Sequence, residues 1–254
     1  MSGLLYICDY GNNSDSDEFE VDNKLPVLKR SEKLPVPNLS HIPAVPVEQY
    51  KDNPDLHNGR VRSFPHVRGN WATFVYIKYQ DEDSLLNFAT KLQSLLLEVK
   101  DLFNLCDDFH LSLSKTVVLN YHTIVPFTQS LKEVFCDIER FYLGFDNIQV
   151  LCNDEKTRTF IVLKADYFSV KSLTSLVKKI DTVLGDFKSE KFYQDPSFHI
   201  SLLWANGDHK EKLETLLDNV NEVISAEVVK KIESVLVDKV YCKSGNKFYQ
   251  YSLD

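Results

Sequence analysis

Apolar residues recur every three or four positions in four segments of the chain, and this spacing predicts four amphipathic helices. The clearest segment is residues 81–103, where acidic side chains at the start also favour a helix N-terminus because they complement the helix dipole. The other three segments are residues 125–143, 170–184 and 208–225. Gly185 directly follows the third, and we expect it to end that helix because glycine readily adopts the left-handed conformation of a C-terminal cap.

Strand-like segments alternate with these helices. Residues 71–79 are rich in the aromatic and β-branched side chains that are typical of strands. Residues 147–152 and 157–165 are separated by four polar residues, a loop short enough for a β-hairpin. Residues 232–242 and 247–253 flank a Ser-Gly-Asn turn and predict a second hairpin at the end of the sequence.

One five-residue phrase occurs twice. Residues 109–113 read Phe-His-Leu-Ser-Leu, and residues 198–202 read Phe-His-Ile-Ser-Leu. On a β-strand, side chains alternate between the two faces, so each copy would bury its three apolar residues and present a histidine and a serine together. The 89 residues between His110 and His199 leave room for a whole α/β unit.

Each copy of the phrase ends a strand, helix, strand sequence, which indicates a duplicated unit. We therefore expect an α+β fold with two pseudo-symmetric lobes, each a small antiparallel sheet backed by helices. The two phrases would lie on the central strands and face a cleft between the lobes.

Two imidazoles in one cleft suit phosphodiester chemistry. Because the ordinary pKa of histidine is about 6.5, a neutral His110 or His199 can remove a proton from an attacking hydroxyl while the other, protonated, gives one to the departing oxygen. The hydroxyls of Ser112 and Ser201, two residues further along each strand, could donate hydrogen bonds to a phosphate held between the imidazoles. This chemistry requires no metal. One His-x-Ser on a strand occurs often by chance, so the repeat itself leaves catalytic and structural interpretations evenly open.

Composition restricts the class of protein further. The 254 residues include no apolar run long enough to span a membrane, and the start of the sequence has no pattern of a secretory signal. Five cysteines, none closely spaced, indicate a reduced intracellular protein and form no zinc motif with histidines. The net charge of −8 argues against a broad basic surface for nucleic acid, although a local basic cleft remains compatible with it.

Part of the negative charge is concentrated at the N-terminus. Residues 1–57 carry ten acidic and five basic side chains, several prolines and no periodic apolar pattern. This composition is typical of a flexible segment. We therefore expect a flexible N-terminal arm over residues 1–57 and a catalytic domain over residues 58–254.

The paired His-x-Ser strands resemble those of the 2H (two-histidine) phosphoesterase superfamily. Several longer runs narrow the resemblance to the U6 small nuclear RNA phosphodiesterases, and together they extend over the chain from residue 59 to its end. These runs are Gly59–Thr73, Asn153–Phe160, Phe192–His199 and Cys242–Phe248. The first and third are the most specific.

The resemblance implies a 3′ to 5′ RNA exonuclease that trims the oligouridine 3′ tail of U6 spliceosomal RNA in the nucleus. The 2′-hydroxyl of the penultimate nucleotide would attack the adjacent phosphorus and expel the terminal nucleoside, leaving a 2′,3′-cyclic phosphate that some members then open. The expected partner is single-stranded RNA, with no cofactor, no metal and no membrane involved. A monomer is the default expectation.

The resemblance also implies the roles of particular residues. His110 and His199 would be the acid/base pair, although the symmetric pattern does not assign the two roles, and Ser112 and Ser201 would hold phosphate oxygens. Tyr193 would stack on the terminal base, where packing in the core is the competing interpretation. Two further residues of the same segment, Asp195 and Ser197, would contact the nucleotide.

Other polar residues fit structural or surface roles as well as binding roles. His122 is expected to be a packed polar residue, and His66 a structural or surface one. Arg60, Arg62 and Arg68 could bind phosphates or hold the arm. Arg158, Asp154 and Lys156 are equally ambiguous.

Two other functions remain open. The histidine pair alone would also permit a cyclic nucleotide phosphodiesterase acting on small or tRNA-derived 2′,3′-cyclic phosphates. A non-catalytic RNA-binding module on the same fold is the alternative outside enzymes.

Overall fold

The computed structural model describes residues 53, 59, 64, 67–96, 103–217 and 234–254, which form strands and helices in alternation. The helices are α1 (Glu82–Leu95), α2 (Tyr121–Phe135) and α3 (Tyr167–Asp186), and residues 210–217 are also helical. The strands are β1 (Asn70–Lys78), β2 (Asn104–Leu105), β3 (His110–Ser112), β4 (Val117–Asn120), β5 (Phe141–Leu143), β6 (Phe145–Cys152), β7 (Arg158–Ala165), β8 (His199–Asn206), β9 (Val235–Val237), β10 (Lys239–Ser244) and β11 (Lys247–Ser252).

A single antiparallel sheet runs through both halves of the fold, in the order β11-β10-β1-β3-β8-β7-β6. Strand β4 also pairs with β1, and β2 with β8. The two halves meet where β3 pairs with β8 through one pair of facing residues, Leu111 and Ile200. The predicted α+β class with two antiparallel halves is confirmed, but the two central strands are direct neighbours in one sheet.

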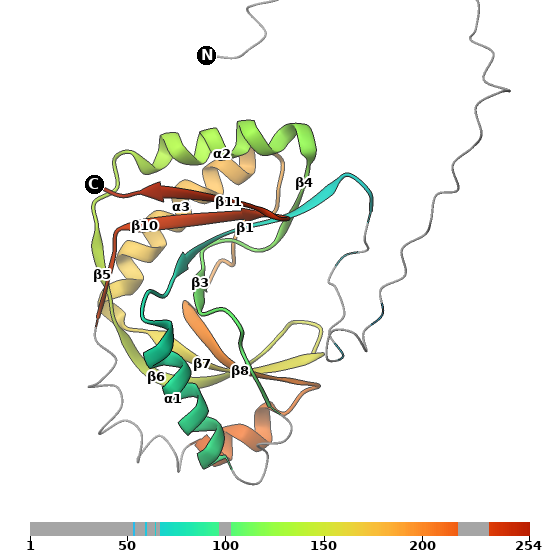
Figure 1. Cartoon of the computed structure of the whole chain (residues 1–254), viewed down its shortest axis with the longest axis vertical. Helices are drawn as coiled ribbons and strands as arrows, with labels where there is room; N and C mark the ends of the chain where they lie inside the picture. The colour runs from blue at the N-terminus through green and yellow to red at the C-terminus, as the bar shows by residue number, and fades with distance from the viewer. Residues whose placement is uncertain (1–52, 54–58, 60–63, 65–66, 97–102, 218–233) are drawn as a thin grey trace, which may run out of the picture. The chain divides into compact units, whose positions relative to one another are not determined.

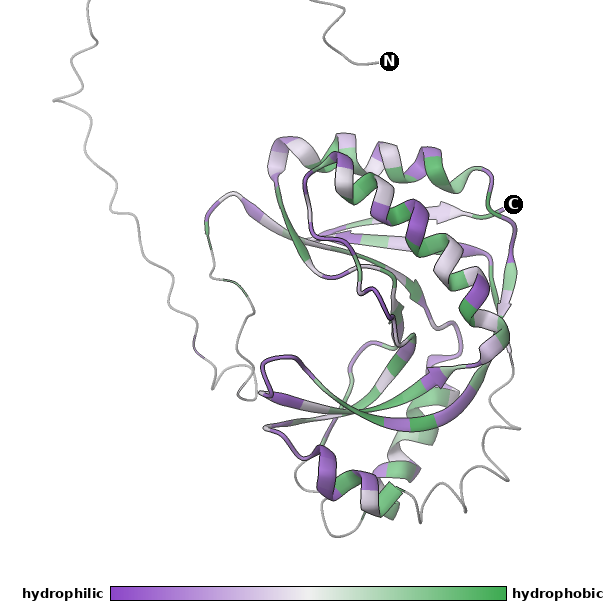
Figure 2. Ribbon diagram, turned by 180° about the vertical axis from the view of Figure 1, so that it is seen from behind, coloured by the Kyte–Doolittle hydropathy of each residue, from purple (hydrophilic) through white to green (hydrophobic). Residues whose placement is uncertain are grey.

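Helices cover the apolar side of each half (Figures 1 and 2). Helices α2 and α3 pack together, and α2 also contacts β4 and β11. Helix α1 contacts β8, although it follows β1 in the chain. The core contains fully buried side chains from the sheet and from each of these helices, including Leu92, Leu111, Leu131, Leu163 and Leu173.

Capping explains where two of the helices begin. The Asp81 carboxylate accepts a hydrogen bond from the backbone N–H of Ser84, and Asp166 does the same for Ser169. These bonds satisfy N–H groups that have no partner within the helix. The end of α3 was predicted two residues early, because the helix continues to Asp186, and the residue with the positive φ of 54° is Lys188, three residues after Gly185.

Both predicted hairpins are confirmed, and two other predictions were wrong. Residues 125–143 are not one helix, because α2 ends at Phe135 and the chain then enters β5. Residues 232–242 are not one strand: β9 pairs with β5 in a separate two-stranded sheet, and β10 joins the main sheet. The short strands β2 and β4 were not predicted. For the helix expected over residues 208–225, the described part is helical at 210–217.

Among the described residues, no helix is long and apolar enough to cross a membrane. The division between an arm at 1–57 and a domain at 58–254 remains a prediction, since residues 1–52 and 54–58 lie outside the described residues.

Candidate active site

The two copies of the repeated phrase lie side by side at the centre of the sheet. Leu111 of β3 faces Ile200 of β8, and both are buried on the helix-covered side. Because the strands are antiparallel, this register sets His110 beside Ser201 and Ser112 beside His199. All four polar side chains therefore belong to the opposite face of the sheet. The structure brings together the four residues that the sequence pattern singled out.

Both histidines are anchored in the same way. The Nδ1 atom of His110 lies 3.2 Å from the backbone oxygen of Asp108, and the Nδ1 atom of His199 lies 2.5 Å from the backbone oxygen of Ser197. A carbonyl oxygen can only accept, so Nδ1 is the donor in each ring. Each Nε2 atom is thereby left to exchange protons with a substrate.

Burial favours the neutral form of both imidazoles. Desolvation is the main cause that lowers the pKa of His110 and of His199 below 6.5. The positive charge of His110, when protonated, lowers the pKa of His199 further, which places the two rings within electrostatic reach of each other. The carboxylate of Asp108, whose Oδ2 atom lies 3.8 Å from Nδ1 of His110, opposes the desolvation at that ring. Ser197 takes the place of Asp108 two residues before His199, so no carboxylate stands at that position to oppose the desolvation of the second ring.

Ser112 and Ser201 are half-buried on the strands that carry the histidines. Within the part of the chain that the structure describes, no side-chain hydrogen bond engages either hydroxyl. Ser114, two residues after Ser112 and beyond the end of β3, is different: it is buried, accepts from the N–H of Val75 and donates to the carbonyl of Lys115. Ser114 is thus committed to the fold, whereas Ser112 and Ser201 keep their donors for a ligand.

Three aromatic rings, those of Phe74, Tyr76 and Tyr241, lie beside His110 or stack on its neighbour. The sequence did not indicate that they belong to the site. Tyr76 lies across from Ser112 in the sheet, and its ring meets the imidazole of His110 edge-on at 5.4 Å. Phe74 contacts the same imidazole at 5.7 Å, and Tyr241 of β10 stacks on Tyr76. These rings desolvate His110 from one side. The sequence marked residues 71–79 as a strand but gave no indication of which strand would be its neighbour.

The three residues predicted on the approach to β8 have different positions. Tyr193 is 49% exposed, which rules out core packing, and the ammonium of Lys115 lies 4.6 Å from the centre of its ring. Asp195 is exposed. Ser197 is exposed too, but it acts on the site through its backbone oxygen, which anchors His199. Lys115, absent from the predicted site, is thus beside a predicted stacking residue.

Several candidates from the sequence lie away from the histidines. His122 is exposed on α2, so the prediction of a packed residue was wrong. The exposed Lys156 lies in the β6–β7 turn and pairs with Asp208 at 3.8 Å, far from the centre of β8. Arg68 is exposed before β1. The remaining arginines and histidine of that segment, Arg60, Arg62 and His66, lie outside the described residues.

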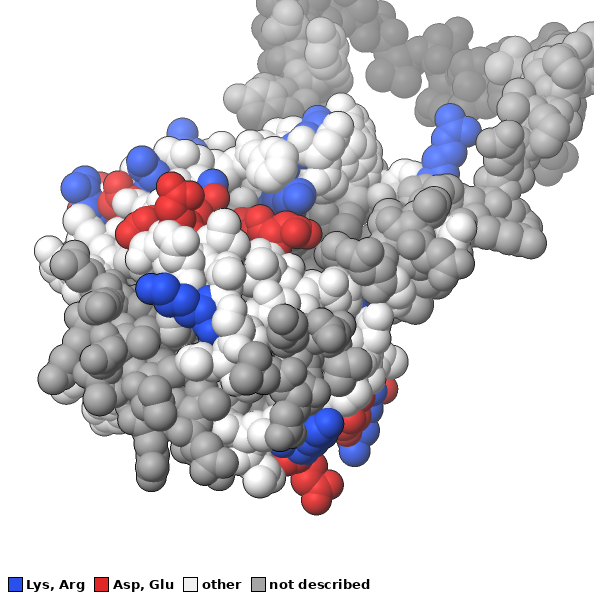
Figure 3. All heavy atoms as spheres, turned by 60° about the horizontal axis from the view of Figure 1, so that its bottom comes forward, with Lys and Arg blue, Asp and Glu red and all other residues white. Residues whose placement is uncertain are grey.

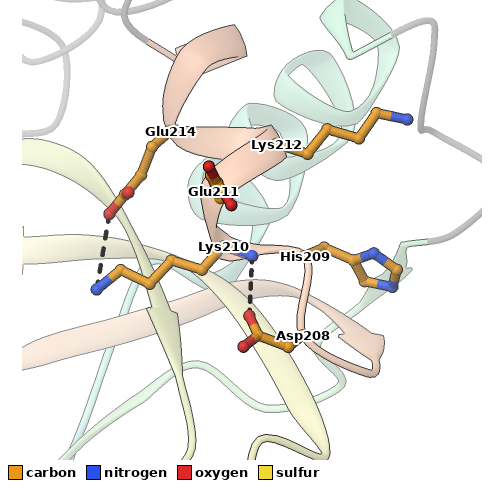
Figure 4. A pocket seen from close by; sticks show the side chains of 6 residues that line it. All are labelled: Asp208, His209, Lys210, Glu211, Lys212 and Glu214. Carbon is orange, nitrogen blue, oxygen red and sulfur yellow. Dashed lines mark hydrogen bonds and ion pairs between the residues drawn. The ribbon is translucent and has the colours of Figure 1, made fainter.

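Charged side chains are mixed elsewhere on the surface. On the face drawn in Figure 3, the described lysines and arginines alternate with acidic residues and do not merge into one basic area. A depression at the start of the 210–217 helix has the same character (Figure 4): Lys210 pairs with Glu214 at 3.6 Å, and its backbone N–H donates to Asp208. This depression follows the far end of β8, about 23 Å along the strand from His199.

Metal-ligating residues do not gather at the site. In the described ranges, no group of three or more histidine, cysteine, aspartate or glutamate side chains is arranged to hold a metal ion.

Two His-x-Ser strands, neighbours at the centre of an antiparallel α+β sheet, define a 2H phosphoesterase fold. The solved structure of Usb1 from Kluyveromyces marxianus has the same fold, with a TM-score of 0.53 at 12% sequence identity over 74% of this chain and all of that one.

Sequence comparison places the chain in a family. The model of the HVSL family, described as an uncharacterised conserved protein, matches residues 33–252, and so begins inside the segment expected to be an arm. U6 snRNA phosphodiesterase 1 of Mus musculus is 40% identical over 88% of this chain and 84% of its own length. The protein of the same name from Drosophila melanogaster is 36% identical over 98% of this chain and all of its own length. The chain belongs to this family of U6 snRNA phosphodiesterases.

Proposed function

We propose that this protein is a 3′ to 5′ RNA exonuclease that trims the oligouridine 3′ end of U6 snRNA. The observation that supports it most is the pair of imidazoles on neighbouring strands, each with Nδ1 bound to a backbone carbonyl and Nε2 available. The choice of U6 snRNA as the substrate is supported by the name of the relatives, U6 snRNA phosphodiesterase 1. A nuclear location and a monomeric state complete the proposal.

The proposed reaction is a transesterification within the RNA. One neutral imidazole of the pair His110 and His199 takes the proton of the penultimate 2′-hydroxyl through Nε2, and the oxygen attacks the neighbouring phosphorus. The other imidazole, protonated, gives its proton to the departing 5′-oxygen of the terminal nucleoside. The new P–O bond closes a 2′,3′-cyclic phosphate. Since the nucleophile belongs to the substrate, little entropy is lost in bringing it to the phosphorus.

The half-buried hydroxyls of Ser112 and Ser201 would donate to the phosphoryl oxygens, and Tyr193 would stack on the terminal base. Stacking on an exposed aromatic ring tolerates any base. Lys115 lies over that ring and pairs with Glu190 at 3.3 Å, so it would help to hold the ring in place beside the terminal nucleotide. Asp195 and Ser197 lie on the same segment and are proposed nucleotide contacts.

Trimming of matched RNAs in the presence of EDTA tests this function. We expect the full chain to shorten an oligouridine RNA under these conditions but not an otherwise identical strand with a 2′-deoxy penultimate nucleotide. Equal shortening of both strands would contradict the transesterification. Ring opening of a 2′,3′-cyclic nucleotide without shortening would instead indicate a cyclic phosphodiesterase, and RNA binding without either reaction a binding module.

Removing a serine hydroxyl should slow the chemical step. We expect Ser112→Ala and Ser201→Ala each to lower the single-turnover rate roughly 100-fold, because the developing phosphoryl charge loses a hydrogen-bond donor. Ser252→Ala, on the exposed side of β11, is the matched control and should trim at the normal rate. Rates within a factor of two of the unmodified protein for both site variants would exclude this role.

The pH profile of trimming should be bell-shaped, with the optimum of kcat/KM shifted below the ordinary histidine pKa. Burial lowers the pKa of both imidazoles, so the free protein acquires its one protonated histidine only below pH 6.5. We therefore expect kcat/KM to peak on the acid side of pH 6.5. A bound phosphate favours the protonated imidazole, so the peak of kcat should lie at higher pH. Steady-state rates between pH 4.5 and 9 measure both profiles, and a kcat/KM that rises steadily to pH 9 would contradict the prediction.

A further inference from the structure

Lysine and aromatic side chains continue the site face of the sheet beyond His110 to its outer strand. The registers set Phe74 of β1 beside Lys243 of β10, and Lys243 beside Phe248 of β11. Paired residues share a face, so all three lie on the face that carries the histidines. From β3 to β11 the row spans three strand spacings, about 14 Å.

Side-chain contacts join the two ends of this row, and the strand register joins its middle. The ring of Phe74 touches the imidazole of His110 at 5.7 Å, and the ammonium of Lys243 lies 5.1 Å from the centre of the Phe248 ring. Lys243 is also close enough to His110 for its charge to lower the pKa of that imidazole. The row therefore begins in contact with the proposed catalytic pair.

Lys243 differs from the other lysines of this half-sheet face. Lys78 pairs with Glu82 at 3.0 Å, and Lys239 lies 3.8 Å from Asp238. In the described ranges, no carboxylate pairs with Lys243. Its positive charge thus remains available for an anion next to the site.

Phe248 is 65% exposed on the outermost strand. Covering a large apolar ring with another flat surface removes it from water and lowers the free energy. A cation beside an exposed ring, a few ångströms apart, is the combination with which proteins hold a phosphate and the base attached to it.

We propose that Lys243 and Phe248 form a subsite for the RNA upstream of the cleaved bond. Lys243 binds the phosphate on the 5′ side of the penultimate nucleotide, and Phe248 stacks on the base of the third nucleotide from the 3′ end. This inference rests on the proposed function and assigns a direction: the terminal base lies toward Tyr193, and the RNA leaves across β1, β10 and β11.

Three short RNAs test the subsite in steps: UpU, pUpU with a 5′-phosphate, and UpUpU. UpU fills neither position, pUpU fills only that of Lys243, and UpUpU fills both. We expect the full chain to cleave the 3′-terminal bond with kcat/KM rising along this series. Lys243→Gln should remove the gain from UpU to pUpU, and Phe248→Ala the gain from the third nucleotide, roughly 5- to 150-fold for one stacked base. Phe248→Ala should cleave UpU as the unmodified protein does. Lys243→Gln should do so when each protein is assayed at its own pH optimum, because the loss of the Lys243 charge removes one influence that lowers the pKa of His110.

An abasic third nucleotide provides the decisive cross-check. If Phe248 stacks on that base, removing the base, the ring or both should cost the same factor, because either loss breaks the one contact. Lys171→Gln and Phe168→Ala, exposed positions on α3, are matched controls and should leave the series unchanged.

The possible failures are distinguishable. Equal gains along the series in Phe248→Ala, Lys243→Gln and the unmodified protein would overturn the subsite while leaving the trimming function intact. If the unmodified protein cleaves none of the three RNAs, the proposed function itself is overturned. If the loss in kcat/KM for Phe248→Ala with the abasic RNA equals the product of the two separate losses, the ring and the base act independently and do not stack on each other.

Discussion

His110→Ala and His199→Ala should each stop trimming, with a loss of roughly 100- to 10,000-fold in the single-turnover rate. The two Nε2 atoms perform opposite proton transfers in one step, so neither ring can replace the other. For the same reason the double variant should be scarcely slower than either single variant, since residues that act as a unit lose their effect together. Shortening of a labelled oligouridine RNA at pH 6 measures all three.

A matched control separates chemistry from folding. His122→Ala changes an exposed histidine on α2 and should trim at the normal rate. The imidazoles themselves give a second check. Their pKa values are lowered in the folded state, so the unfolded chain binds more protons and stability is lost as the pH falls below 6.5. His110→Ala or His199→Ala should therefore lose less stability than the unmodified protein between pH 7.5 and 5. Trimming above a tenth of the normal rate in either site variant would rule out the paired mechanism.

The sequence predicted the centre of the site because the signal there is local. Alternation within five residues indicates the apolar and polar faces of each strand, and the second copy repeats the pattern with the same three apolar positions. His110, Ser112, His199 and Ser201 could thus be named from the pattern alone. That β3 and β8 would pair directly could not, because pairing is decided by contacts between residues 89 positions apart.

Residues that lie beside the histidines from other strands had no comparable signal. From the sequence, Tyr76 and Phe74 could be identified only as residues that favour a strand, and Lys243 only as a charged residue of a predicted hairpin. They reach the site because β1 lies between β3 and β10, an order that the chain does not follow. The division of residues 232–242 has the same origin: Val237 pairs with Phe141 of β5, and Lys239 belongs to another sheet.

The junction between the two halves should be the position where a core substitution harms both stability and chemistry. Strand β3 has three residues, and its central side chain, Leu111, is fully buried between Ile77 of β1 and Ile200 of β8. Leu111→Ala would leave a cavity between the strands that carry the two histidines. We expect a loss of about 2–5 kcal/mol in the free energy of unfolding. For a domain of this size the melting temperature should fall by roughly 5–20 °C.

Leu131→Ala is the matched control, since Leu131 is equally buried but lies on α2. Both variants should lose similar stability in thermal melts. At a temperature where both remain folded, Leu131→Ala should keep the normal single-turnover rate. Leu111→Ala should trim at least roughly tenfold more slowly, because a displacement of about 1 Å between reacting groups is enough to cost up to a hundredfold in rate. Equal rates in the two folded variants would mean that the Leu111–Ile200 contact supports the fold without setting the distance between the imidazoles.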